Sequence, residues 1–252
     1  MRFSTAKAGD AGRQPPDAAL HHLASHLRFW LVACAVLALD LWSKNWVFDN
    51  LAADRTHTLI PGIIELRRSL NDGAVFGSLT GYVGLFIAAS VFALGFVSYL
   101  FACSGSGQRA LHVALGMILA GALGNLYDRA VTEADVVIFK SPSGRERTLI
   151  GRIIEPPAGH LDNDEAIYVG SWPDGSRPQR FDKSEVSVRS QGVVRDFIKF
   201  TPEFPTWVPW LGKRRQRDVW PWVFNVADSA LVCGVAALLL SSWLETSNRK
   251  RA

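Results

Sequence analysis

Residues 82–103 read YVGLFIAASVFALGFVSYLFAC, a run of 22 positions without a charged side chain. The hydrocarbon core of a bilayer is about 30 Å thick, and a helix needs roughly 20 apolar residues to cross it. Three further apolar segments are long enough to do so, at about residues 27–47, 110–130 and 219–244. The sequence therefore predicts an integral membrane protein with four transmembrane helices.

The average composition hides this segregation, because the remaining segments are polar. Of 252 residues, 48% are apolar and 20% are charged, and Lys and Arg exceed Asp and Glu by only 27 to 23. So small a positive excess does not suggest a nucleic-acid-binding protein. The three cysteines stand alone in apolar stretches, which excludes a disulfide framework and predicts buried core residues.

The segments between the helices do not have a helical pattern. Runs such as TLIGRII and AIYVGSW alternate with turn residues, which is typical of short strands. We expect a short β-cradle in residues 48–81 and an inserted β subdomain in residues 131–192. Residues 204–222 hold four tryptophans around Lys213-Arg214-Arg215 and are expected to lie at the outer membrane interface. The predicted class is an all-α membrane protein that carries extracytoplasmic β elements.

Positive charge beside the helices predicts their orientation. Arg28, Arg109 and the tail Asn248-Arg249-Lys250-Arg251 mark cytoplasmic ends under the positive-inside rule. Both termini are then cytoplasmic, as a disordered tail at 1–26 and a basic tail at 245–252. The two longer loops lie on the outer side.

Polar residues interrupt three of the predicted helices, and under this topology all of them fall near the outer end. They are Asp40 and Lys44, then Asn125, Asp128 and Arg129, then Asn225 and Asp228. Ionisable side chains inside a membrane are costly and are functional by default. One shared depth in three separate helices predicts a single site.

The plainer interpretation is a set of structural ion pairs, because Asp40 and Lys44 are spaced i,i+4 on one helix face. It does not explain Asp228, which has apolar neighbours and no cation one turn away. A second carboxylate nearby would share one proton with Asp228, and such a pair can divide acid and base roles and activate a water. That is the arrangement of an aspartic peptidase, and the residues alone make Asp128 the natural partner.

Five motifs carry a resemblance that covers roughly residues 27–130 and 193–244. They are Asp40-Leu-Trp-Ser-Lys44, Asn71-Asp-Gly-Ala-Val-Phe-Gly77, Gly121-Ala-Leu-Gly-Asn-Leu-Tyr-Asp-Arg129, Val193-Val-Arg-Asp-Phe-Ile198 and Trp220-Pro-Trp-Val-Phe-Asn-Val-Ala-Asp-Ser-Ala230. In this order they resemble the motifs of the lipoprotein signal peptidases (signal peptidase II). The chain departs from the family by its long 130–192 stretch and by Arg195, which stands before the aspartate of the fourth motif.

The resemblance implies a catalytic dyad of Asp196 and Asp228 that needs no metal and no cofactor. It implies substrate-binding or supporting roles for Asp40, Lys44, Asn71, Asn125, Asp128, Arg129 and Asn225. The implied activity is removal of the signal peptide from diacylglyceryl-modified prolipoproteins, by a monomer among membrane lipids, at the periplasmic face of the bacterial inner membrane.

Two alternatives from other classes remain at this point. A small membrane transporter or proton relay also uses buried carboxylates, but it predicts polar residues at several depths and an inverted repeat. The sequence shows one layer and no internal repeat. A membrane scaffold, whose β subdomain binds a partner while the ion pairs are inert, would function without Asp228.

Overall fold

The computed structural model describes residues 18–73, 83–156, 165–205 and 218–251. Its helices are the 3-10 turn η1 (Ala19–His21), α1 (Leu23–Asn50), α2 (Val83–Cys103), α3 (Arg109–Val131) and α4 (Val226–Arg251). Three predictions fall outside the described ranges: most of the 1–26 tail, the interfacial segment from Trp207 to Arg215, and residues 74–77 of the second motif.

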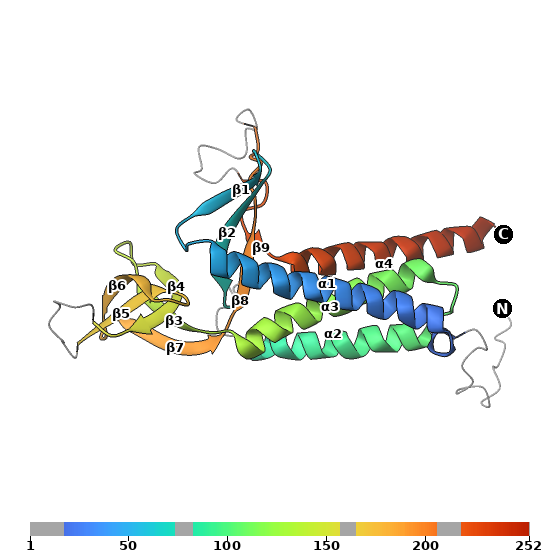
Figure 1. Ribbon diagram of the computed structural model, residues 1–252, viewed down its shortest axis with the longest axis horizontal. Helices are drawn as coiled ribbons and strands as arrows, with labels where there is room; N and C mark the ends of the chain where they lie inside the picture. Colours follow the sequence, from blue (N-terminus) through green and yellow to red (C-terminus); the bar gives the residue numbers. More distant parts are fainter. Residues whose placement is uncertain (1–17, 74–82, 157–164, 206–217, 252) are drawn as a thin grey trace, which may run out of the picture.

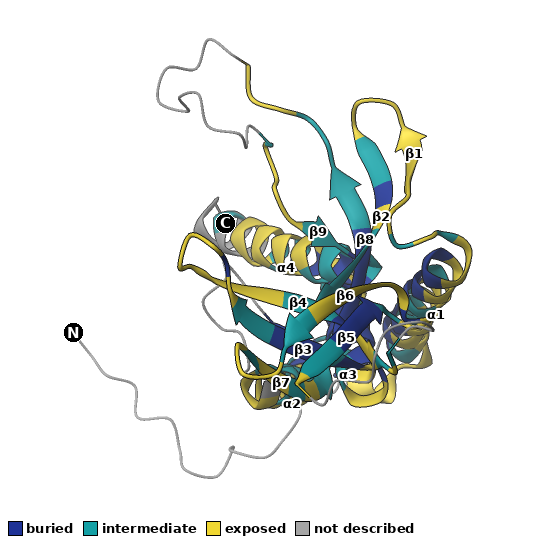
Figure 2. Cartoon of the chain, turned by 90° about the vertical axis from the view of Figure 1, so that its left-hand side faces the viewer, coloured by how far each residue is buried: buried dark blue, intermediate teal, exposed yellow. Residues whose placement is uncertain are grey.

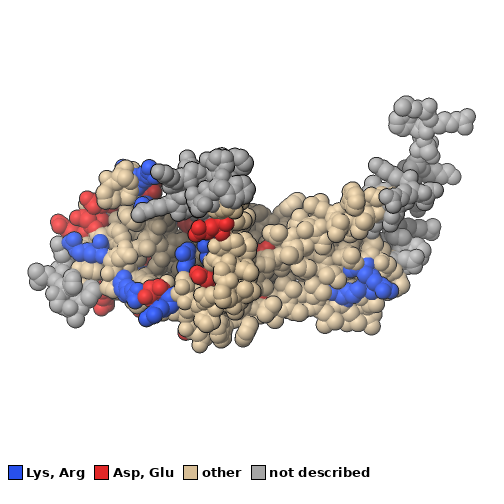
Figure 3. Space-filling view, turned by 90° about the horizontal axis from the view of Figure 1, so that it is seen from above, with Lys and Arg blue, Asp and Glu red and all other residues tan. Residues whose placement is uncertain are grey.

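Each of the four long helices contains a stretch long and apolar enough to cross a membrane, as predicted. The helices lie side by side, and α3 packs against the other three (Figure 1). In α3, 61% of the apolar window is buried, against 11% to 22% in α1, α2 and α4. The outward faces of those helices are exposed (Figure 2) and carry large apolar side chains such as Leu31, Phe92 and Val232. A band without charges covers the helices in Figure 3, so the surface suits lipid rather than water.

Two details of the helices differ from the predictions. The helix α4 begins at Val226 rather than near residue 219, because Val223 and Phe224 form a short strand after Pro221. The cysteines Cys34, Cys103 and Cys233 are exposed, so the prediction that they are core residues is wrong. In a protein with one central helix, an apolar residue on an outer helix faces lipid as readily as the core.

The prediction of an all-α class is also wrong, because the described part of the chain is 47% helix and 32% strand and contains two antiparallel sheets. Two of its strands, β6 (Ser176–Asp182) and β8 (Val194–Phe200), lack the alternation that reveals a half-buried strand. The first residues of β6 are exposed throughout, whereas the first four of β8 are all buried. Without alternation of apolar and polar residues, neither strand can be distinguished from a loop by its sequence.

The first sheet, which we call the cradle, stands at the end of the bundle where α1 and α3 end and α4 begins (Figure 1). Its strand order is β1-β2-β8-β9, built from β1 (Thr56–Ile60), β2 (Ile64–Asn71), β8 and β9 (Val223–Phe224). The β2–β8 register pairs Ser69 with Asp196 and Asn71 with Val194. Segments far apart in the chain thus meet in one sheet.

The second sheet, which we call the insertion, extends beyond the end of α3 (Figure 1). Its order is β6-β5-β4-β3-β7, from β3 (Glu133–Lys140), β4 (Glu146–Ile154), β5 (Ala166–Ser171), β6 and β7 (Val186–Gly192). Its two ends meet, because the N–H of Val193 donates to the carbonyl of Thr132 at 2.9 Å. At the junction a Cβ on Gly192 would lie 1.9 Å from the carbonyl oxygen of Arg129, so only glycine fits.

Candidate active site

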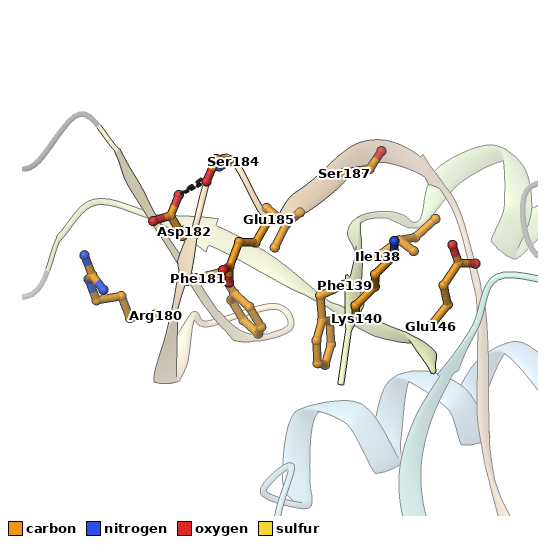
Figure 4. Close-up of a pocket in the computed structure, with 11 residues that line it drawn as sticks. Ile138, Phe139, Lys140, Glu146, Arg180, Phe181, Asp182, Ser184, Glu185 and Ser187 are labelled. Carbon is orange, nitrogen blue, oxygen red and sulfur yellow. Dashed lines mark hydrogen bonds between the residues drawn. The ribbon is translucent and has the colours of Figure 1, made fainter. Parts of the chain in front are cut away.

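Two pockets in the described part of the chain are lined by several carboxylates, and the larger pocket is not the candidate site. It measures about 820 Å³ and lies in the insertion, between the ends of β3 and β6 (Figure 4). There Asp182 is half-buried and accepts hydrogen bonds from the hydroxyl and the N–H of Ser184. These hydrogen bonds lower the pKa of Asp182, so it is an ordinary ionised carboxylate without a proton to donate.

The smaller pocket is a cavity of about 490 Å³ between the cradle, the insertion and the start of α4. Both Asp196, from β8, and Asp228, from the first turn of α4, line it. It therefore contains the two carboxylates that the motifs single out.

Asp196 is the buried member of the pair, with 2% of its surface exposed. Its Oδ2 accepts a hydrogen bond from Nδ2 of Asn71 at 3.0 Å, and its Oδ1 accepts one from Nδ2 of Asn225 at 2.7 Å. Burial raises the pKa of Asp196 to about 8, and the nearby charge of Asp228 adds to the rise, although the amide donors and Lys44 oppose it. At neutral pH Asp196 therefore carries a proton.

Asp228 is half-buried and is held by the hydrogen bonds that begin α4. The Oδ1 of Asn225 accepts from the N–H of Asp228 at 2.9 Å, and Oδ2 of Asp228 accepts from the N–H of Asn225 at 3.1 Å. This reciprocal pair has the form of a capping box, in which each side chain satisfies a free N–H at the helix start. The start of α4 and the orientation of Asp228 therefore depend on the same contacts.

Beneath the two aspartates lies a buried ion network that is neutral as a whole. Nζ of Lys44 lies 2.7 Å from Oδ2 of Asp40 and 3.3 Å from Oδ2 of Asp128. Nη2 of Arg195 lies 2.7 Å from Oδ1 of Asp128, and Oδ1 of Asp40 accepts the N–H of Ala227 at 2.8 Å. Buried charges are tolerated when they are paired in this way. The network ties α1, α3, β8 and α4 together at one level.

Asn125 connects this network to the aspartates. Its Oδ1 accepts from Nζ of Lys44 at 3.4 Å and from Nδ2 of Asn225 at 3.1 Å. Its Nδ2 must then point the other way, and it donates to Oδ1 of Asp228 at 2.8 Å. The amide of Asn125 is oriented by a cation on one side and a carboxylate on the other.

Of the predicted site residues, Asp40, Lys44, Asn71, Asn125, Asp128 and Asn225 lie in this network with the two aspartates. Within the described residues Arg129 is connected to this set through the backbone of Asn125 and forms no ion pair with its carboxylates. It donates to the carbonyl of Asn125 at 3.3 Å, and its guanidinium lies 4.9 Å from the centre of the Phe86 ring. Asp128, the partner suggested for Asp228 by the residues alone, is occupied by Lys44 and Arg195 instead.

Sequence reasoning missed Arg195 and Asn45. Besides its bonds to Asp128, Arg195 donates through Nη1 to Oδ1 of Asn45 at 2.6 Å. The available signal was a cation among the apolar residues of Val193-Val-Arg-Asp-Phe, since a buried arginine requires a carboxylate partner. Asn45 carries no comparable signal. Across residues 18–73, 83–156, 165–205 and 218–251, no group of three His, Cys, Asp or Glu side chains is arranged to hold a metal ion.

Comparisons with known proteins agree with the motifs. Residues 32–244 match the family model described as signal peptidase (SPase) II. The lipoprotein signal peptidase of Latilactobacillus sakei is 34% identical over 114 residues, which cover 45% of this chain and 76% of that protein. The lipoprotein signal peptidase of Listeria welshimeri is 33% identical over 111 residues, which cover 44% of this chain and 71% of that protein.

A solved structure shares the fold. It is a bacterial membrane enzyme determined by the in meso method at 2.3 Å resolution, and it is 21% identical to this chain. The superposition has a TM-score of 0.54 and covers 88% of this chain and 91% of the other. With the match to the family model and to the curated relatives, it follows that this chain belongs to the signal peptidase II family of membrane aspartic peptidases.

Proposed function

We propose that Asp196 and Asp228 form the catalytic dyad of a membrane endopeptidase that removes signal peptides from diacylglyceryl-modified prolipoproteins. Membership of the family supports the activity and the substrate class. The observation that carries the dyad is the pair of carboxylates in one cavity, both bonded to Asn225, with a proton retained on the buried member.

The two aspartates differ in a way that assigns their roles. Asp228 is the more exposed and takes a proton from a water molecule as the water oxygen attacks the scissile carbonyl carbon. Asp196 gives its proton to the carbonyl oxygen, which yields a tetrahedral intermediate. In the second step Asp228 passes its proton to the leaving nitrogen, the C–N bond breaks, and Asp196 recovers a proton from a hydroxyl of the intermediate. At the end both aspartates have their starting protonation states, and the two protons of the consumed water are in the products.

The remaining polar residues act as positioning residues for the dyad. Asn71 and Asn225 hold Asp196, while Asn125 holds Asp228 and is itself oriented by Lys44. Lys44, Asp40, Asp128 and Arg195 neutralise one another, so they fix the helices without adding net charge to the site. Rigid support of this kind keeps reacting groups in a productive geometry.

The topology of the proposal places the dyad at the periplasmic face of the bacterial inner membrane. The tails 1–26 and 245–252 are then cytoplasmic, residues 27–130 and 193–244 form the peptidase core, and residues 131–192 form a periplasmic subdomain. Arg28 and Arg109, at the bundle end away from the cradle, support this orientation. The enzyme acts as a monomer, with the lipid of the substrate among the helices and the cradle against its extended chain.

The dyad is tested by cleavage of a diacylglyceryl-modified prolipoprotein by purified protein in bilayers. Asp196→Asn and Asp228→Asn are each expected to lower kcat by about 10²- to 10⁴-fold, the usual contribution of a general acid or base. Asp182→Asn, which changes a half-buried carboxylate in the pocket of the insertion, is the control and keeps full turnover. Near-normal turnover in either dyad variant overturns the assignment.

A further inference from the structure

The cavity that holds the two aspartates is not formed by the cradle and the helices alone. Thr148 and Ile150, both on β4 of the insertion, line it together with Asp196 and Asp228. Thr148 is exposed and Ile150 is half-buried. The insertion therefore contributes a wall to the candidate active site.

The strand register explains why this face of the insertion meets the cradle. Ile138 of β3 pairs with Thr148, and Val136 of β3 pairs with Ile150 on one side and with Arg189 of β7 on the other. Residues that pair directly across strands share one face of a sheet. On that face the guanidinium of Arg189 lies 3.9 Å from the carboxylate of Asp72, which is the neighbour in sequence of Asn71.

A second set of contacts fixes the insertion against the cradle and α1. Nη2 of Arg68 donates to the carbonyl of Trp172, and the guanidinium of Arg68 lies 5.0 Å from the centre of the Phe48 ring. The rings of Phe48 and Trp172 meet edge to face at 5.9 Å. Arg177 of β6 also pairs with Asp54 at 2.6 Å. These contacts come from Trp172, in the turn after β5, and from Arg177 of β6, and β5 pairs with β4, so they hold β4 in place over the cavity.

From these contacts, and resting on the proposed function, we infer that the insertion is part of the substrate-binding cleft. Thr148 and Ile150 contact the segment of the prolipoprotein that follows the cleaved bond. The signal peptide lies among the helices, whereas β4 lies beyond the ends of α1 and α3, on the way out of the membrane (Figure 1). The chain that leaves the bilayer after the modified cysteine has to pass this wall.

The wall also gives the cleft a charge preference. Among its described lining residues the ionisable ones are Asp72, Asp228 and the protonated Asp196, and none is basic, so the negative charge comes from Asp72 and Asp228. Thr148 and Ile150 add a hydroxyl and an apolar surface without charge. Like charges at close range repel, so an acidic residue shortly after the cleavage site binds less well than a neutral or basic one.

The test uses two substrates that differ only after the cleavage site. The long one keeps an extended mature segment, and the short one ends one residue after the modified cysteine. Thr148→Trp and Ile150→Trp fill the wall and are expected to lower the ratio of kcat/KM for the long substrate to that for the short one by about tenfold. Ile153→Trp is the matched control, because Ile153 lies three positions from Ile150 on the opposite face of β4 and does not line the cavity. Its ratio stays at the wild-type value.

A gain of preference gives a second, independent readout. Thr148→Lys places a cation among the carboxylates and is expected to raise kcat/KM for a long substrate with an acidic residue after the cleavage site, relative to its neutral counterpart. Unchanged ratios in the Thr148 variants overturn the inference, and so does an equal loss on long and short substrates. Thr148 is exposed, so its variants keep the test valid if Ile150→Trp does not fold. Failure of the proposed function itself is distinguishable, because Asp228→Asn would then cleave both substrates.

Discussion

At the scale of single residues, the side chain and backbone of Asn225 set the relation between the two aspartates. The side-chain amide donates to Asp196, while the backbone N–H donates to Asp228. The same residue is therefore a helix cap and a bridge across the site. An amide suits this position because it has both donors and acceptors and carries no charge that would change the protonation of either carboxylate.

The retained proton of Asp196 leads to a prediction about pH. Its pKa in the folded protein is about 8, against about 3.9 for a free aspartate, because burial and Asp228 disfavour the charged form. In the proposed mechanism Asp196 donates a proton, so kcat/KM is expected to fall above pH 8 by about tenfold per pH unit. The measurement is a pH profile of prolipoprotein cleavage. A rate that stays level to pH 10 contradicts the role of Asp196 as the acid.

The same shift links stability to pH. A carboxyl group whose folded pKa is raised contributes stability that is complete below about pH 4 and is lost as the pH rises through about 8. The melting temperature of the wild type is therefore expected to fall over this interval more steeply than that of Asp196→Asn, which cannot ionise. Parallel curves for the two proteins would show that Asp196 is not the titrating group.

Some residues of the site could be predicted from the sequence and others could not, for a physical reason. The polar residues of the helices stand out because a membrane span has few reasons to carry charge. Asp196 does not stand out in this way, because its sequence neighbourhood contains many charged residues. It was identified only through the family resemblance. Arg195 and Asn45, which complete the ion network, depend on a contact between α1 and β8 that no local pattern encodes.

At the scale of elements, the packing of α1 against α3 depends on small residues, and Gly124 is the one beside the site. A Cβ on Gly124 would lie 2.4 Å from Oδ2 of Asp40, the oxygen that pairs with Lys44. Gly124→Ala is therefore expected to displace Asp40 and to cost about 1–3 kcal/mol of stability, as overpacking usually does. The small-residue spacing of Gly116, Ala120, Gly121 and Gly124 predicts such close packing, and the three glycines lack room for a side chain.

A matched glycine on a neighbouring helix provides the control. A Cβ on Gly95 of α2 meets no atom within 4 Å, so Gly95→Ala is expected to leave stability unchanged or raise it slightly. Thermal unfolding of both variants in the same lipid is the measurement. Equal melting temperatures would mean that the site around Asp40 can relax and that the contact is not tight.

Elements were predictable where one physical rule dominates. The bilayer sets the length and apolarity of a span, so the four helices follow from the sequence within a few residues, apart from α4, which starts later than predicted and runs on to Arg251. Strands have no such rule when they are buried on both faces, like the start of β8, or are mostly exposed, like β6. The class prediction failed because these strands and their partners form two complete sheets.

At the scale of the whole molecule, the chain enters and leaves the insertion at one place, beside the end of α3. Thr132 and Val193 are already hydrogen-bonded, so a two-residue turn can replace residues 133–192 without moving α3 or β8. This deletion variant is expected to fold and to cleave prolipoprotein, with a weaker preference for the long substrate over the short one. The measurements are circular dichroism and the two-substrate assay. Loss of helix content would show that the core requires the insertion for folding.

The hydrogen bond between Asp40 and the N–H of Ala227 has a consequence for biosynthesis. It joins the first span to the last one, and the dyad needs Asp228 from that last span. A nascent chain with only three spans inserted holds Lys44 and its carboxylate partners but lacks Asn225 and Asp228. With the proposed dyad, the protease is expected to be inert during translation and to become active only after its final helix has entered the membrane and Asp40 has bonded to Ala227.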